Sequence, residues 1–264
     1  MKLLPLLSSC ALLLTLAGVA ALSASCGRAE VKQEDASTSV AVGGLIAEAD
    51  KEYAQRGSIE HARQAAAILR RARVSDYNSY EAVWKLSRAD YFLGMHEQEE
   101  QLKLEAFREG IAAGESTVKN WPDRPEGHFW LGANLGGRAK VQGPLYALSS
   151  VGDIRREMEA VIKLDEGFQD GCAYLALGQV DLELPEMMGG DRKRAIEELE
   201  KGLRFGENNA LLRLYLARAY YAVKRHADAR AQANAILKMK PNPDYLPEYQ
   251  EAAEGARKLL EKLS

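Results

Sequence analysis

The sequence predicts an all-α protein built from repeated pairs of helices, with a single capping helix at the C-terminus. Apolar residues recur with helical spacing from Leu45 almost to Ser264, and no stretch alternates as a strand would. Similar helical pairs also follow one another along the chain. We expect such pairs to bury their apolar faces against one another and to stack into an α-solenoid, a right-handed superhelix with a concave inner face.

The N-terminal residues 1–25 have the pattern of a secretory signal peptide. After Lys2 the stretch LLPLLSSCALLLTLAGVAALSAS carries no charge, and small residues lead up to Cys26. The alternative is a retained transmembrane helix, because the apolar stretch is long enough to cross a bilayer. The small residues before Cys26 and the polar segment after it favour export.

Cys26 admits two interpretations. The segment Leu22-Ser23-Ala24-Ser25-Cys26 resembles the lipoprotein cleavage motif, although Ser23 stands where that motif prefers a bulky aliphatic residue. Acylation would anchor the protein in a membrane, since each buried methylene contributes about 0.8 kcal/mol. Otherwise Cys26 is an ordinary thiol after a simple cleavage site. We favour lipidation at Cys26, and Gly27 in place of an aspartate favours the outer membrane.

Residues 26–44 are predicted to form a flexible tether, and residues 45–264 the helical repeat domain. The stretch GRAEVKQEDASTSVAVGG has no aromatic residue and many small polar ones, so it cannot bury enough apolar surface to order itself. Cys172 is the only cysteine of the repeat domain and cannot form an internal disulfide. Its apolar surroundings predict a buried, unreactive thiol.

The clearest helical pair begins at Ala210 and reads ALLRLYLARAYYAVKRHADARAQANAILKMKPN. Leu216, Ala217, Tyr220 and Ala229 stand where a tetratricopeptide repeat of about 34 residues places the large and small residues that interlock its two helices. The segments EADKEYAQRGSIEHARQAAAILRRA and EAVWKLSRADYFLG carry the same pattern earlier in the chain. The sequence therefore predicts a protein of the tetratricopeptide-repeat (TPR) type.

Two further pairs depart from the pattern. In the first, DRPEGHFWLGANLGGRAK supplies one helix, and an insertion around GPLYALSS is expected to delay the second helix until VGDIRREMEAVIKLD. In the second, DGCAYLALGQVDLELP is followed by the loop EMMGGD and the helix DRKRAIEELEKGL. The charged stretch from Tyr245 to Leu263 is predicted to be a capping helix that covers the last apolar face.

No residue pattern indicates catalysis, a cofactor or a metal. The histidines lie apart without metal-ligand spacing, and no serine stands in a GxSxG turn. Gly132, Gly136 and Gly137 lie in a run that lacks the lysine of a phosphate loop, so we expect them to permit close helix packing. A net charge of −3 without a basic cluster argues against nucleic-acid binding. We expect a binding protein and not an enzyme.

The first helix of each pair should line the concave face, which repeat proteins use for binding. Counting positions within each pair gives a mostly apolar groove with three polar points. The candidate binding residues are Lys85, Phe92, Phe129, Gln179, Leu182, Arg218 and Tyr221. Such a groove suits an amphipathic segment or an apolar ligand with an anionic end, unless the tether or the cap fills it.

The loop that contains Met187, Met188, Gly189 and Gly190 is a second candidate contact. As a simple turn, its glycines permit positive φ and Asp191 caps the following helix. As a contact, the loop presents methionines, whose thioethers adapt to varied surfaces.

Three segments resemble the TatT family, the T-components of TRAP transporters: GHFWLGANLGGRAK, DIRREMEAVIKLDEGF and LPEMMGGDRKRAIEELEKGL. Members of that family are periplasmic lipoproteins built from degenerate tetratricopeptide units, and the resemblance covers roughly Leu45 to Pro241. It implies an accessory component of solute uptake that docks a periplasmic substrate-binding protein for small, often carboxylate-bearing solutes. Two alternatives stay open: a general cell-envelope scaffold for protein assembly, and a carrier of a hydrophobic ligand in its groove.

Overall fold

The computed structural model describes residues 26–264, so the predicted signal peptide lies outside the described residues. The chain divides into two compact units, Met1–Val40 and Ala41–Ser264. The first helix, α1, spans Cys26–Ala54, and its last turns belong to the second unit. That second unit contains the whole of the remaining chain.

All regular structure between residues 26 and 264 is helical. The helices after α1 are α2 (Ile59–Ser75), α3 (Tyr80–His96), α4 (Glu100–Asn120), α5 (Pro125–Gln142), α6 (Pro144–Leu164), α7 (Phe168–Glu183), α8 (Arg192–Leu203), α9 (Ala210–Ala222), α10 (His226–Lys238) and α11 (Leu246–Leu263). Two short 3₁₀ helices, η1 (Glu186–Met188) and η2 (Pro243–Tyr245), precede α8 and α11. Among these described helices, none is both long and apolar enough to span a membrane.

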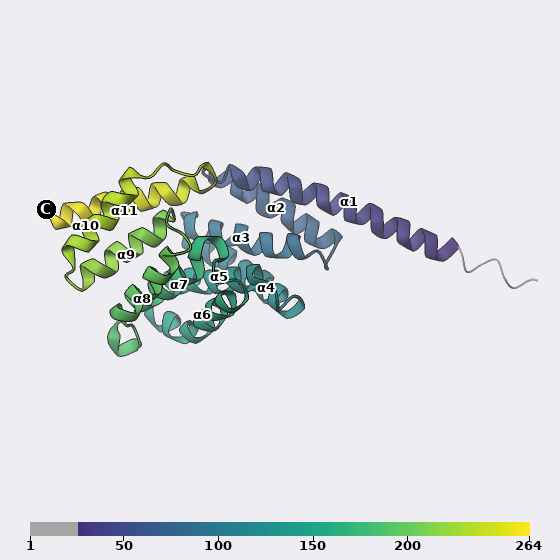
Figure 1. Ribbon diagram of the computed structural model, residues 1–264. Helices are drawn as coiled ribbons and strands as arrows, with labels where there is room; N and C mark the ends of the chain where they lie inside the picture. The colour runs from purple at the N-terminus through teal and green to yellow at the C-terminus, as the bar shows by residue number, and fades with distance from the viewer. Residues whose placement is uncertain (1–25) are drawn as a thin grey trace, which may run out of the picture. The chain divides into compact units, whose positions relative to one another are not determined.

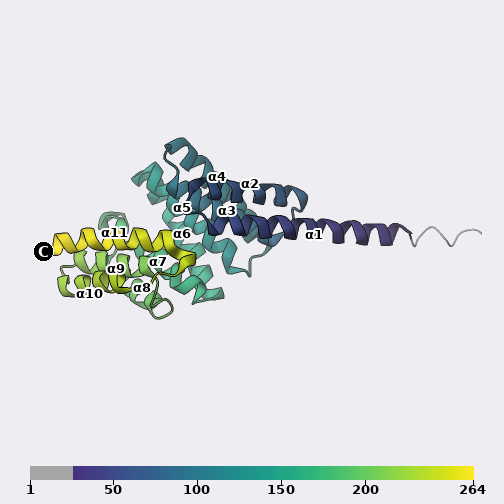
Figure 2. The same cartoon turned by 90° about the horizontal axis from the view of Figure 1, so that it is seen from above.

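The helices of the second unit form the predicted pairs. The end of α1 packs with α2, and α3 with α4, α5 with α6, α7 with α8 and α9 with α10 follow in order. The first helices of successive pairs, α3, α5, α7 and α9, are neighbours of one another. The last helix, α11, lies along α9 and α10 (Figures 1 and 2). The all-α, TPR-like repeat fold with a C-terminal capping helix is therefore confirmed.

Capping residues explain where several helices begin. The side chains of Ser79, Asp191 and Asn209 accept hydrogen bonds from backbone N–H groups in the first turns of α3, α8 and α9. Pro125 and Pro144 stand at the first positions of α5 and α6, where a missing N–H costs nothing. The predicted capping role of Asp191 is thus confirmed.

The segment 26–44 differs from its prediction as a flexible tether, because α1 includes all of it. At its end, Val42 is buried and lies one helical turn before the buried Ile46. Both side chains pack with Ala72 of α2 and Ala82 of α3. Two aliphatic residues at helical spacing are therefore enough to dock the end of this segment, although its composition is mainly small and polar.

The expected insertion around GPLYALSS is also different in the structure. Gly143 has a φ of 88° and makes a sharp turn, and α6 begins at the next residue, Pro144. The inserted residues therefore lengthen α6 at its N-terminus and do not form a loop. Since proline is favoured in the first turn of a helix, Pro144 was the sequence signal for this start.

Glycines set the contact between α4 and its neighbours α3 and α5. The fully buried ring of Phe107 lies against Gly94 and Gly137, where an added Cβ would lie 2.5 and 2.3 Å from the ring. An added Cβ at Gly132 would lie 2.4 Å from Met158. Close packing is thus confirmed for Gly132 and Gly137. It is wrong for Gly136, where the nearest atom would be 3.9 Å away.

Alanine substitutions at the neighbouring glycines of α5 are expected to change the free energy of unfolding in opposite directions. Gly137→Ala should lower the free energy of unfolding by about 1–3 kcal/mol, because the buried Phe107 ring has no room to move. Gly136→Ala should raise it by about 0.5–1 kcal/mol, since alanine favours the helix and meets open space. Urea denaturation followed by circular dichroism measures both. Equal changes in the two variants would contradict the packing described here.

Candidate functional site

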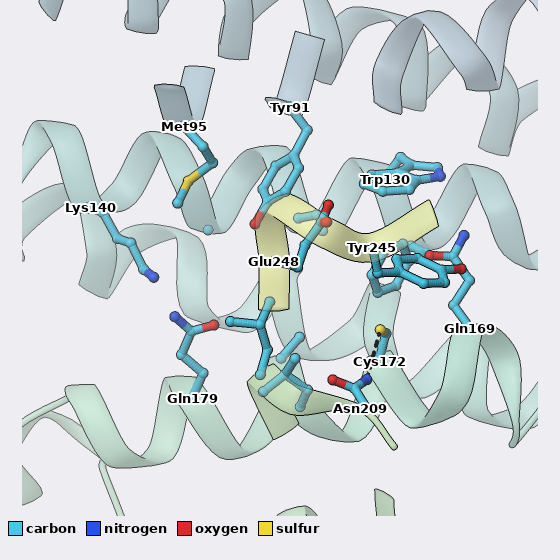
Figure 3. Close-up of a pocket in the computed structure, with 18 of the residues that line it drawn as sticks. Tyr91, Met95, Trp130, Lys140, Gln169, Cys172, Gln179, Asn209, Tyr245 and Glu248 are labelled. Carbon is cyan, nitrogen blue, oxygen red and sulfur yellow. Dashed lines mark hydrogen bonds between the residues drawn. The ribbon is translucent and has the colours of Figure 1, made fainter. Parts of the chain in front are cut away.

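The inner side of the second unit contains a half-open cavity of about 860 Å³. Its walls come mainly from α3, α5, α6 and α7, and residues from the start of α9 and from η2 and α11 complete them. Cavities of roughly 300–1,000 Å³ are typical of sites for small molecules. This half-open cavity is therefore of ligand size (Figure 3).

Aromatic side chains form one wall of the cavity. Tyr91 of α3 lies beside Trp130 of α5 with 5.7 Å between the ring centroids, and Phe129 meets Trp130 edge-on at 4.9 Å. Successive repeats bring these rings together, because they stand on the first helices of neighbouring pairs. Met95 lines the cavity beside them (Figure 3). This wall suits a flat or apolar molecule.

Polar groups gather at one side of the cavity, where Lys140 and Gln179 point toward one another (Figure 3). The Gln179 amide donates to the Tyr215 hydroxyl at 2.7 Å and to Glu183 at 3.1 Å. Lys140 also pairs with Glu183, at 3.6 Å. The amide and the ammonium group are thus held in place by side chains of α7 and α9.

A left-handed turn stands at the opposite side. Gln169, Asp170 and Gly171 have φ values of 44°, 57° and 77°, and the first two line the cavity. Asn209 holds this turn by donating to the carbonyl of Asp170 at 3.2 Å, and its amide also lies 3.6 Å from the Cys172 sulfur. Positive φ in two residues other than glycine is a strained arrangement of the kind found at functional sites.

Cys172 lies in the cavity wall and is half-buried (Figure 3). Burial raises the pKa of its thiol to about 12, so the thiol is protonated at neutral pH. The prediction of an unreactive thiol agrees with this protonation state. Its position facing a cavity was not predicted.

Arg56 joins the first helical pair to the cap beside the cavity. This side chain is only 5% exposed and donates to the carbonyl of Asp244 at 2.6 Å and to both carboxylate oxygens of Glu248 at 2.9 and 3.0 Å. Its guanidinium also lies over the Tyr53 ring. Residues far apart in the sequence thereby meet at the cavity wall, where the end of α1 lies near the start of α11 (Figure 1).

Of the predicted groove residues, Phe129 and Gln179 line the cavity and the others do not. Lys85 is engaged by Asp50 of α1 at 2.6 Å, and Phe92 is buried in the first hydrophobic core. Both lie where α1 packs on α3. The α1 helix therefore covers the beginning of the predicted groove.

The end of the groove is covered by the cap. Gly255 of α11 lies against Leu214 and Arg218, whose guanidinium also stacks over the Tyr215 ring. Leu182 packs against the core between α7, α8 and α9, and Tyr221 lies partly exposed with its ring stacked on His226. Lys85 and Arg218, the expected polar points for an anionic ligand end, thus do not line the cavity.

Four residues that line the cavity were not predicted from the sequence: Tyr91, Trp130, Tyr245 and Glu248. Tyr91 stands in EAVWKLSRADYFLG, whose repeat pattern predicts a helical pair and not a ligand site. Trp130 lies next to the predicted Phe129, and their common helix was the available signal. Tyr245 and Glu248 belong to the cap, and no local pattern shows that the cap reaches the cavity.

The predicted contact loop is divided between two environments. Met187 is 94% exposed, whereas Met188 lines the cavity. Gly189 takes a φ of 90°, and an added Cβ at Gly190 would collide with the carbonyl of Leu184. The glycines are therefore required by the turn, as its simpler interpretation predicted.

A buried ion pair links α5 to α6. The His128 ring lies 2.6 Å from Glu157 through Nδ1 and 2.9 Å from the carbonyl of Pro122 through Nε2. Since both neighbours are acceptors, the ring satisfies them by donating from both nitrogens as an imidazolium. The hydrogen bond to Glu157 accordingly raises the pKa of His128. Burial raises the pKa of Glu157, but the bonds from His128 and Arg156 outweigh it and lower that pKa overall.

The stability that His128 contributes should be lost as the pH rises. It is complete below the unfolded pKa of about 6.5 and disappears as the pH passes through the raised pKa of the folded state. Thermal melts from mildly acidic to alkaline pH should show a falling Tm that His128→Gln makes shallower. The matched variant at the exposed His226, His226→Gln, should keep the wild-type slope. A wild-type slope in His128→Gln would contradict the pairing.

Over residues 39–264, whose side chains the structure describes, no group of three or more side chains could hold a metal ion. The stacked helical pairs and the inward-facing pocket define a TPR-type helical-repeat protein, a class that commonly binds protein partners and is generally non-catalytic. A tetratricopeptide repeat family matches residues 187–250. The family described as regulator of microtubule dynamics protein 1-3 matches residues 45–187, more than half of the chain, and the chain belongs to this family.

Solved structures share the fold at low sequence identity. TTC0263, a thermophilic TPR protein of Thermus thermophilus, has a TM-score of 0.55 and 18% identity, over 80% of this chain and 98% of that chain. PilF of Pseudomonas aeruginosa has a TM-score of 0.53 and 19% identity, over 86% of this chain and 93% of that chain. No curated protein sequence matches this chain significantly. These likenesses concern the fold alone.

Proposed function

We propose that this protein is a non-catalytic lipoprotein of the cell envelope that holds a small, mostly apolar solute in its cavity. In this proposal residues 1–25 direct export to the periplasm, Cys26 carries the lipid anchor, and the protein serves as the accessory T-component of a TRAP-type solute uptake system. The observation that carries the proposal is the pocket of about 860 Å³ on the inner side of the repeats. A peptide segment would need a long groove, and α1 and α11 cover its two ends.

The docking of a periplasmic substrate-binding protein would use the outer surface. Residues of the turn before α8 and of the turn after α9 line a second hollow, of about 560 Å³. Met187, in the turn before α8, is 94% exposed, and Val223, in the turn after α9, is partly exposed. Exposed apolar side chains rimmed by charged ones are typical of a contact for another protein.

Crosslinking of the tagged full-length protein in its native membranes tests this docking. We expect mass spectrometry to identify a periplasmic solute-binding protein that Met187→Glu loses. Because Met187 is exposed, this substitution should leave the fold intact. Leu102→Glu, at a partly exposed position on α4, is the matched control and should retain the partner.

A general cell-envelope scaffold is the second candidate, and the exposed Met187 is equally compatible with it. Recovery of envelope assembly factors without any solute-binding protein would favour the scaffold and overturn the transport proposal. The cavity gives the scaffold no role, so retention of a small molecule by the purified protein distinguishes the two.

A further inference from the structure

Three tyrosine hydroxyls of the second unit donate to glutamates, whereas those of the tyrosines that line the cavity do not. Outside the cavity, the hydroxyls of Tyr80, Tyr174 and Tyr220 each donate to a glutamate, at 2.5–2.6 Å. Four tyrosines line the cavity: Tyr53, Tyr91, Tyr245 and Tyr249. Among residues 39–264, whose side chains the structure describes, none of these four hydroxyls bonds to another side chain or to the backbone. The Tyr91 hydroxyl points into the cavity (Figure 3).

Two of these phenols are held in their neutral, donating form. Burial raises the pKa of both Tyr53 and Tyr91. Trp130 packs beside Tyr91, but its Nε1 is buried and points away from the Tyr91 hydroxyl (Figure 3). The Tyr91 hydroxyl is therefore the group of this wall that offers a hydrogen bond to an oxygen acceptor in the cavity.

The charged groups of the lining are mostly neutralised by one another. Arg56 pairs with Glu248, Arg88 with Asp50 at 3.3 Å, and Lys140 with Glu183. Lys240 is exposed at the edge of the lining, where water already solvates it. An anion in the cavity would thus lose its hydration without gaining a buried, unpaired cation, which is unfavourable.

We propose that the cavity binds an uncharged molecule with an aromatic or hydrocarbon body and at least one oxygen acceptor, such as a ketone, ester or ether. The body packs against Phe129, Trp130 and Met95, and the oxygen accepts from the Tyr91 hydroxyl. This inference rests on the proposed function, because it names the ligand of the same cavity. It departs from the carboxylate-bearing solutes that the resemblance to T-components implies.

Three fluorescent probes test the inference on the full-length protein in detergent. N-phenyl-1-naphthylamine and 8-anilinonaphthalene-1-sulfonate share one body and differ by a sulfonate, so their comparison isolates charge. The neutral ketone 6-propionyl-2-dimethylaminonaphthalene tests the acceptor. Each probe is titrated with the wild type and, in the same detergent, with Gly136→Trp, whose indole would occupy the cavity. Subtracting the fluorescence of the variant from that of the wild type removes the signal of probe bound to micelles.

We expect the neutral amine to bind at least about tenfold more tightly than the sulfonate. Tyr91→Phe should weaken the binding of the ketone probe by about three- to tenfold, because one hydrogen bond is lost. Tyr220→Phe, outside the cavity, should not weaken it. Equal or tighter binding of the sulfonate, or an unchanged ketone affinity in Tyr91→Phe, would overturn the inference and leave the proposed function standing. No difference between wild type and Gly136→Trp for any probe would overturn both.

Discussion

Asp181→Ala is expected to lower the free energy of unfolding by about 2–4 kcal/mol. The carboxylate is fully buried and accepts from Arg155 of α6 at 2.5 Å and from Arg194 of α8 at 2.7 Å. Burial raises the pKa of Asp181, but the bonds from these two arginines outweigh it and lower that pKa overall. Alanine would leave both guanidinium groups without their partner. Arg194 is partly exposed to solvent, so water can solvate its guanidinium once the carboxylate is gone. The expected loss of unfolding free energy is therefore smaller than that for a fully buried ion pair.

Urea denaturation of Asp181→Ala, followed by circular dichroism, measures this loss. Glu254→Ala is the matched control, because it removes a carboxylate whose pair with Lys258 is exposed. That control should change stability by less than about 1 kcal/mol. Similar stabilities of Asp181→Ala and wild type would show that the packing of α6, α7 and α8 does not depend on this carboxylate.

Gly136→Trp is expected to lower the affinity of the cavity for a neutral probe at least about tenfold. Gly136 lines the cavity, and a side chain at this position enters open space with Ile154 as its nearest neighbour. An indole there removes volume from the ligand site without displacing the core around Phe107. Gly136→Ala adds only a methyl group and should keep nearly the wild-type affinity. Thermal melts of both variants separate loss of the cavity from loss of the fold.

Binding to Gly136→Trp with wild-type affinity would contradict the assignment of this cavity. The same result in a variant that melts far below the wild type would contradict it equally, because binding would still not depend on the open cavity.

Local periodicity was sufficient to predict the helical pairs, because each pair is held by residues close in sequence. Leu216, Ala217 and Tyr220 of α9 are buried where the repeat pattern placed them. The start of α6 was missed because the pattern alone did not distinguish a loop from a longer helix at Pro144. The docking of Val42 and Ile46 was likewise not predicted, because the segment around Val42 has no aromatic residue and a mainly small, polar composition.

The cavity could be predicted only in part. Phe129 and Gln179 line it because both stand on the inner helices of their pairs. Its closure depends on Arg56 and Glu248, which are separated by 192 residues. The two residues meet because the rotations between successive helical pairs add up along the whole chain. No local sequence pattern shows that total rotation. For the same reason, the cover that α11 places over Arg218 was not specified by the residues around it.

Native mass spectrometry of the full-length protein, purified from its own membranes, shows whether the cavity is a ligand site. We expect one small molecule bound per chain in the wild type, released on unfolding and absent from Gly136→Trp. Its fragmentation should reveal an uncharged, mostly apolar compound that contains oxygen. A wild-type protein without any bound molecule, together with no uptake of the neutral probes, would contradict the claim that the cavity is a ligand site.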